Sequence, residues 1–236
     1  MNLLLKSIKD SPLSYLPRES LRSLVHFIDG YRSRCDMEGV PYDWQYDRWA
    51  FNTWLYKRFQ MTHKKPIRSI KIMELFSIDD ADAFHQHFAL LAEFLLTPEN
   101  AKFHVDPKKA RRDFLEMVKD IRHRFVVHPK TATFLELSSY LMGDERAQLE
   151  LGLAVDEGRA TFRDFQEWVE VEKNSSKLRR PWFKIIEFSS GGRDSDNPAC
   201  SLFFDWLDQY AIHICKPGLF EPIPRRTAGK VSRQVH

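Results

Sequence analysis

The sequence predicts an all-α protein, a multi-helix bundle built from two pseudo-repeated helical halves with a connecting basic helix. Apolar residues recur at intervals of three and four along most of the chain, which is the period of an amphipathic helix. Typical helix start and stop residues bracket these stretches, and the same order of features occurs twice. With 236 residues, 43% of them hydrophobic and 13% aromatic, the chain has enough apolar surface for a substantial core.

Helix signals are clear in the first half. In SLRSLVHFIDGY the apolar residues follow helical spacing, Ser20 suits an N-cap, and Gly30 is expected to end the helix. The segment FNTWLYKRF places its aromatic residues on one stripe. A third helix is expected to begin near Ser77, with Asp79, Asp80 and Asp82 at its positive end, and to stop before Thr97-Pro98.

The rest of the chain repeats these signals. The basic stretch DPKKARRDFLEMVKDIRHRF predicts a helix from Asp106 to about Phe125, and Asn197 before Pro198 is another helix start. The segments IKIMELF and WFKIIEF are either short helices or strands, and their lack of strict alternation favours helices. The tail from Lys216 has three prolines and few apolar residues, which predicts an extended, partly mobile segment.

An internal duplication is indicated by the alignment of KKPIRSIKIMELFS with RRPWFKIIEFSS. Upstream, Phe51 and Trp54 align with Phe165 and Trp168, and downstream Phe94 aligns with Tyr210. Gly30 aligns with Gly143 when the alignment includes a four-residue gap. The predicted units are a first helical repeat at 7–97, a basic connector helix at 98–124, a second repeat at 125–215 and an extended basic tail at 216–236.

The net charge of +3 conceals an uneven distribution along the chain. By count, residues 99–134 carry +4, residues 135–215 carry −6 and the tail carries +4. Such blocks favour either a charged partner or pairing within the molecule. Three widely spaced cysteines and the absence of a long apolar run favour a cytoplasmic protein with no membrane segment. The apolar run in MNLLLKSIKDSP is too short for a signal peptide.

Catalytic motifs are missing from the sequence. There is no phosphate-binding, dinucleotide-binding, serine-hydrolase or zinc-protease motif, and the histidines lack partners at zinc-like spacing. The glycine-containing SSGGRD, residues 189–194, is interpreted as a turn because no lysine follows it at phosphate-loop spacing. We therefore expect no cofactor, no metal and no enzymatic activity, although an enzyme with dispersed catalytic residues remains an alternative.

The order of a Pro–aromatic start, a Leu-rich helix, an FxxW helix and a Phe-rich closing helix resembles a group of small bacterial proteins encoded beside toxin genes. They are immunity proteins of polymorphic-toxin, contact-dependent inhibition and type VI effector systems. Pro17 stands where that group usually has a glycine, and this chain carries the outline twice. The residues that fit the outline in the first half are Pro12, Tyr15, Leu16, Ser20, Leu21, Leu24, Phe27, Gly30, Tyr31, Phe51, Trp54, Ala83, Phe88, Leu91 and Phe94.

The resemblance implies an immunity protein, of antitoxin type, that neutralises a cognate toxin by blocking its active site. The acidic second half suits a basic toxin domain, such as a nuclease with a positive active site. Candidate contacts, chosen by charge, are Asp144, Glu145, Asp156, Glu157, Asp194 and Asp196. The alternative is a nucleic-acid-associated helical protein that contacts phosphates through Lys108, Lys109, Arg111 and Arg112.

Overall fold

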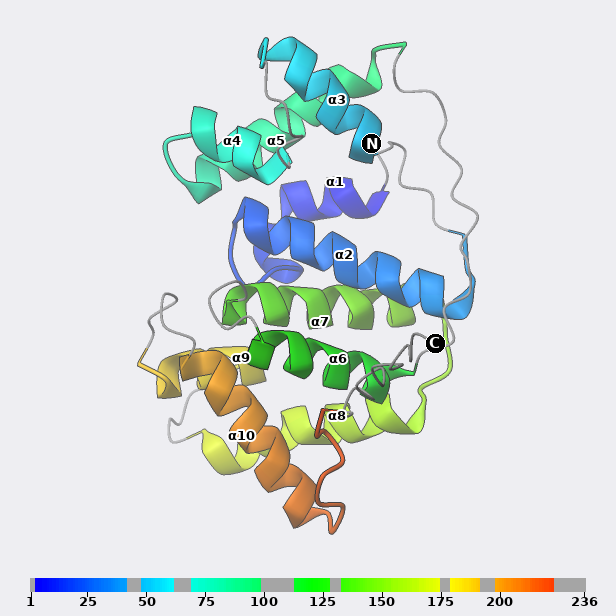
Figure 1. Cartoon of the computed structure of the whole chain (residues 1–236), viewed down its shortest axis with the longest axis vertical. Coiled ribbons are helices and arrows are strands. Elements are labelled where there is room, and N and C mark those ends of the chain that lie inside the picture. Colours follow the sequence, from blue (N-terminus) through cyan, green and yellow to red (C-terminus); the bar gives the residue numbers. More distant parts are fainter. Residues whose placement is uncertain are drawn as a thin grey trace, which may run out of the picture.

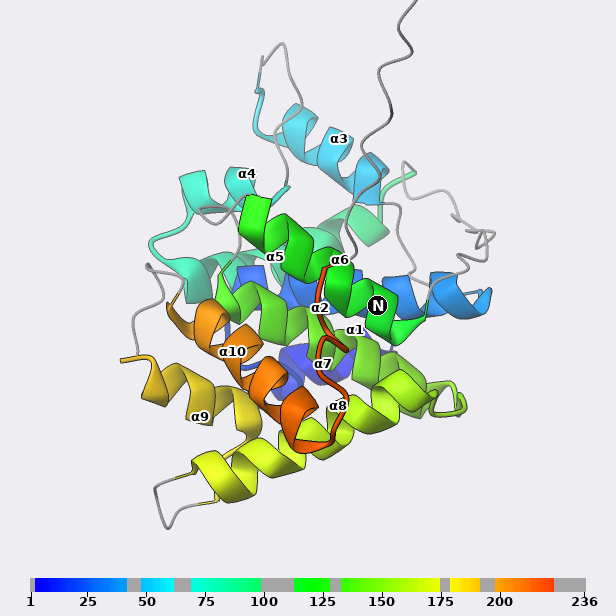
Figure 2. The same ribbon diagram turned by 60° about the horizontal axis from the view of Figure 1, so that its bottom comes forward.

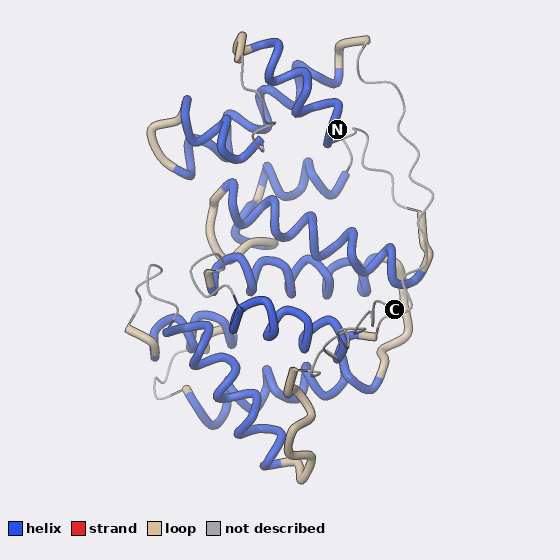
Figure 3. The backbone as a smooth tube through the Cα atoms, in the orientation of Figure 1, coloured by secondary structure: helices blue, strands red, loops and turns tan. Residues whose placement is uncertain are grey.

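The structure, a computed structural model, describes residues 3–41, 48–61, 69–98, 113–127, 133–174, 179–191 and 198–222. Within these ranges all regular structure is helical and no strand is present (Figure 1, Figure 3). The predicted all-α class is therefore confirmed for the described chain.

Five α-helices are described in each half of the chain. The first half contains α1 (Leu3–Asp10), the 3₁₀ turn η1 (Pro12–Ser14), α2 (Leu21–Glu38), α3 (Arg48–Arg58), α4 (Ser69–Phe76) and α5 (Asp80–Leu95). The second half contains α6 (Phe114–Val127), α7 (Phe134–Glu150), α8 (Glu157–Trp168), the π-helical turn η2 (Val169–Lys173), α9 (Trp182–Ser189) and α10 (Pro198–His213). The segments IKIMELF and WFKIIEF form α4 and α9, so the helical interpretation of both is confirmed.

Two hydrophobic clusters lie on either side of the α2–α7 pair, which forms the most extensive helix contact (Figure 1). Helices α1 to α5 supply the first cluster and α6 to α10 the second. Ala147 of α7 belongs to the first cluster and Met37 of α2 to the second, so each central helix also contributes to the opposite core. The beginning of the tail belongs to the second cluster, because Phe220 is fully buried there. Residues 217–220 form turns, in which the N–H groups of Leu219 and Glu221 donate to the carbonyls of Lys216 and Gly218, whereas an extended tail was predicted; residues 223–236 lie outside the described chain.

Two predicted helix starts are confirmed by capping contacts. The Ser20 hydroxyl accepts the backbone N–H of Ser23 at 3.1 Å, which begins α2. The Asp79 carboxylate accepts the N–H of Asp82 at 2.8 Å, which begins α5. These side chains satisfy backbone donors that the first turn of a helix leaves free.

The basic helix begins later than the sequence predicted. Asp113 is not helical, and its carboxylate accepts the N–H of Glu116 at 2.7 Å, so α6 starts at Phe114 and not near Asp106. In chain order α6 takes the place in the second half that α1 takes in the first. Helix α1 was not predicted from the sequence, although it buries Leu5 and Ile8 in the first cluster.

Gly30 does not end α2, contrary to the prediction. The helix continues to Glu38 and ends at Gly39, which has a left-handed φ of 65°. Gly143 likewise lies inside α7.

Gly30 and Gly143 mark the crossing of α2 and α7. A Cβ added at Gly30 would overlap the carbonyl oxygen of Tyr140, and one added at Gly143 would overlap that of Phe27. Each glycine thus lies against the backbone carbonyl of the residue three positions before the other glycine. The glycines are needed here for close approach between helices and not for a helix stop.

Aromatic contacts recur at the aligned positions of the two halves. Each FxxW pair packs on one ring of the closing helix, at centroid distances between 5.3 and 5.8 Å. The recurring pairs are Phe51–Phe94 with Phe165–Tyr210, and Trp54–Phe94 with Trp168–Tyr210. Matched contacts of this kind agree with the proposed duplication, which itself stays a prediction.

Candidate functional site

Charged side chains are buried where α2, α7 and α8 meet. Asp144 has 0% relative exposure and forms an ion pair with Arg159, which is 4% exposed. Arg34 of α2, also buried, pairs with Glu38 at 3.0 Å and with Asp156 at 3.4 Å. Buried charges are tolerated only when they are paired, so this cluster ties the three helices together.

Three of the acidic residues predicted to contact a partner, Asp144, Asp156 and Glu157, form ion pairs within the molecule. Asp144 is fully buried, so it cannot form part of a binding surface in this structure. Asp156 caps α8 by accepting the N–H of Arg159 at 2.9 Å and also pairs with Arg34. Glu157 is exposed and binds the ammonium group of Lys216 at 2.8 Å. Asp194 and Asp196, and the basic residues Lys108, Lys109, Arg111 and Arg112, lie outside the described residues.

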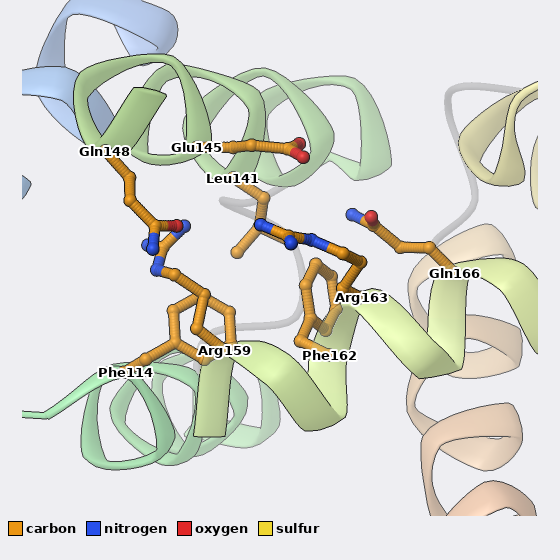
Figure 4. Close-up of a pocket in the computed structure, with 8 residues that line it drawn as sticks. All are labelled: Phe114, Leu141, Glu145, Gln148, Arg159, Phe162, Arg163 and Gln166. Atoms are coloured by element: carbon orange, nitrogen blue, oxygen red, sulfur yellow. The ribbon is translucent and has the colours of Figure 1, made fainter. Parts of the chain in front are cut away.

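Glu145 borders a small recess between α7, α8 and the start of α6 (Figure 4). The other lining residues are Phe114, Leu141, Gln148, Arg159, Phe162, Arg163 and Gln166. The recess has a volume of about 10 Å³, which is room for a single water molecule. Burial raises the pKa of Glu145, and the positive charge of Arg163 opposes that shift. This recess is therefore a polar gap in the packing and is too small for an organic substrate.

A second set of ion pairs fixes α4 and α9. Glu74 of α4 accepts hydrogen bonds from Arg22 at 2.7 Å and from Lys71 at 2.6 Å. At the aligned position of α9, Glu187 pairs with Lys184 at 2.8 Å and with Arg18. Burial disfavours the charged form of both carboxyl groups, but these hydrogen bonds outweigh it and hold the pKa of Glu74 and of Glu187 below the ordinary value.

The lowered pKa values predict a specific acid sensitivity. A carboxyl group whose folded-state pKa is depressed stabilises the fold above its unfolded value, near pH 4.5, and loses that contribution as the pH falls through the folded value. We expect Glu74→Gln/Glu187→Gln to be less stable than the parent at pH 7 and to lose less stability on acidification to pH 3. Urea unfolding at pH 7, 5, 4 and 3 measures this difference. Parallel curves for the two proteins would contradict it, and Glu116→Gln, at an exposed carboxylate of α6, is the control.

The outer face of α8 carries an acidic stripe that the sequence analysis missed. The stripe consists of Asp164 and Glu167, which are exposed and three residues apart on α8, and of exposed Glu172, which follows on η2. At the aligned positions of α3, Ala50 and Thr53 stand in place of Asp164 and Glu167. The sequence itself indicates this exposed face, because the apolar residues that alternate with the stripe form the buried face of the helix. They are Phe162, Phe165 and Val169.

The described residues contain no group of three or more His, Cys, Asp or Glu side chains placed to hold a metal ion. Within the same part of the chain, every helix is too short or too polar to cross a membrane. Comparisons of the chain with protein families, with curated proteins and with solved structures found no match.

Proposed function

We propose that the protein is an immunity-type inhibitor that binds a basic toxin domain and blocks its active site. The proposal is supported by the resemblance of the chain to immunity proteins of bacterial toxin systems. The observation that carries it is the acidic stripe of Asp164, Glu167 and Glu172 on the exposed face of α8 and η2. A binder of this kind needs a rigid face with charge complementary to its partner, and it needs no catalytic residues.

The stripe is not required by the scaffold. α3 occupies the same place in the first half and packs its Phe51 and Trp54 in the same way, without acidic residues at the aligned positions. The acids also point away from the second hydrophobic cluster, on the side opposite Phe165 and Val169. Charges that are exposed and add nothing to the core are available for a partner.

The first experiment captures partners of the tagged full chain from source cells after nuclease treatment and identifies them by mass spectrometry. Each captured protein is then expressed alone and together with this chain. A protein that arrests growth alone and is harmless in co-expression supports the proposal. Captured proteins without toxicity would remove the proposal. Captured material that disappears with nuclease would also remove it and would favour the nucleic-acid alternative.

Charge reversal on the stripe is expected to weaken neutralisation. With Asp164→Lys/Glu167→Lys the association rate with the toxin should fall on the order of tenfold at low salt, because complementary fields raise association rates by about that factor or more. The control is Asp10→Lys/Glu116→Lys, which makes the same change in net charge at exposed positions of α1 and α6. Surface-based binding kinetics measure both variants. Equal rates for the two would locate the interface elsewhere.

A further inference from the structure

Three rings from α8 and α10 gather beside the acidic stripe. Trp168 lies 5.7 Å from Tyr210 and 6.3 Å from His213, and Tyr210 lies 6.2 Å from His213, measured between ring centroids. The interplanar angles are 50°, 34° and 32°, so each pair of rings is tilted, neither stacked nor set edge to face. Trp168 is half-buried and His213 is exposed, so the cluster reaches the surface where the end of α10 lies against α8 (Figure 2).

Two carboxylates of α8 act on these rings. Burial raises the pKa of the Tyr210 hydroxyl, and the charges of Asp164 and Glu167 raise it further. Both carboxylates therefore act on the ring cluster through space while remaining exposed themselves. Aromatic faces and carboxylates both attract cations, so the two kinds of group favour the same class of ligand.

A cation from the chain itself already lies on these rings. The Lys173 ammonium group is 4.6 Å from the Trp168 ring centroid and 5.6 Å from that of Trp206, and it donates a hydrogen bond to Gln209 at 2.9 Å. These distances fall within the range of a cation–π contact. The η2 turn brings Lys173 to this position, and π-helical turns occur frequently at functional sites.

The first half provides an internal comparison. Its Phe51, Trp54 and Phe94 form the same ring contacts, so the aromatic base belongs to the scaffold of both halves. The aligned positions lack the phenol and the imidazole, since Phe94 stands where the second half has Tyr210 and Thr97 stands where it has His213. The carboxylates are missing there as well. The imidazole, the phenol and both acids are therefore additions to the second half alone.

We infer that the surface formed by Trp168 and His213 over the buried Tyr210, with Asp164 and Glu167 at its edge, is a receptor for a cationic side chain of a protein partner. The inference rests on the proposed function in naming a basic protein as the partner. An arginine fits better than a lysine, because its planar guanidinium can stack on a ring while its N–H groups bind carboxylates. Tryptophan and arginine are also enriched at the hot spots of protein interfaces.

The test titrates the full chain with two short peptides, acetyl-Gly-Arg-Gly-amide and acetyl-Gly-citrulline-Gly-amide, and follows indole and ring resonances by NMR. Citrulline has the shape of arginine without its charge. We expect saturable shifts at Trp168 and His213 with the arginine peptide and at least threefold weaker binding of the citrulline peptide. Trp54, in the aligned position of the first half, serves as the internal control and should not shift.

Substitution at the two acids tests the receptor without touching the buried rings. Asp164→Asn/Glu167→Gln should weaken binding of the arginine peptide at least threefold. No saturable shift at Trp168 up to 50 mM peptide, equal binding of both peptides, or equal shifts at Trp54 would overturn the inference. The titration needs no toxin, so a failure to neutralise any toxin together with specific arginine binding would remove the proposed function and leave the receptor standing.

Discussion

Replacing Gly143 by alanine is expected to destabilise the protein by at least about 3 kcal/mol. The added methyl group would overlap the Phe27 carbonyl oxygen, which belongs to the backbone of α2 and cannot rotate away. The two helices would have to separate, and both hydrophobic clusters would lose packing against them. The sign is informative, because alanine in place of glycine inside a helix otherwise stabilises it by about 1 kcal/mol. Urea unfolding followed by circular dichroism measures the change.

Gly30→Ala should behave in the same way, since its methyl group would meet the Tyr140 carbonyl. Gly158→Ala is the matched control. There the nearest atom to the added Cβ is the Leu115 side-chain Cγ at 2.6 Å, and a side chain can shift where a backbone cannot. If all three variants lost the same stability, the close approach of α2 and α7 would not be the cause.

Replacing Asp144 by asparagine is expected to cost about 3 to 5 kcal/mol. The change is nearly isosteric, but it leaves the buried Arg159 guanidinium without its counterion, and Arg34 adds a second positive charge nearby. Burial lowers the pKa of Arg159 to about 9, the positive charges of Arg34 and Arg163 lower it further, and the Glu38 carboxylate opposes the shift. Chemical unfolding at pH 7 measures the loss.

Removing both charges separates the cost of an unpaired ion from the value of the pair. In Asp144→Leu/Arg159→Met apolar atoms take the place of both charged groups, and most of the stability that Asp144→Asn loses should return. Glu157→Gln, at the exposed pair with Lys216, should leave the unfolding midpoint unchanged. An asparagine variant as stable as the parent would show that Asp144 contributes no charge to the cluster.

The helical fold was readable from the sequence because periodicity and capping residues are local signals. Ser20 and Asp79 cap the helices they were expected to cap. Gly30 misled the prediction because glycine both ends helices and permits close helix contact, and only the partner helix distinguishes the two. Tyr31 and Cys35 continue the buried stripe beyond it, and Gly39 shortly before Pro41 is the better stop signal.

Choosing surface acids by charge alone failed at Asp144 for a related reason. Leu137, Leu141, Asp144 and Gln148 are spaced by four, three and four residues, so Asp144 lies on the buried stripe of α7. Asp164 and Glu167 lie opposite the buried stripe of α8, where the same analysis would have placed them at the surface. What the sequence could not provide is the neighbour that pairs with each acid, because Arg34 and Arg159 are distant along the chain.

The α2–α7 crossing also bears on how the surface of this protein can change over generations. Its closest approach is set by backbone atoms and by Gly30 and Gly143, so it makes few demands on the side chains of the outer helices. Substitutions can accumulate on α8 without disturbing the packing of α3, and the reverse holds as well. The surface of one half of the molecule can then change while the central pair of helices preserves the architecture.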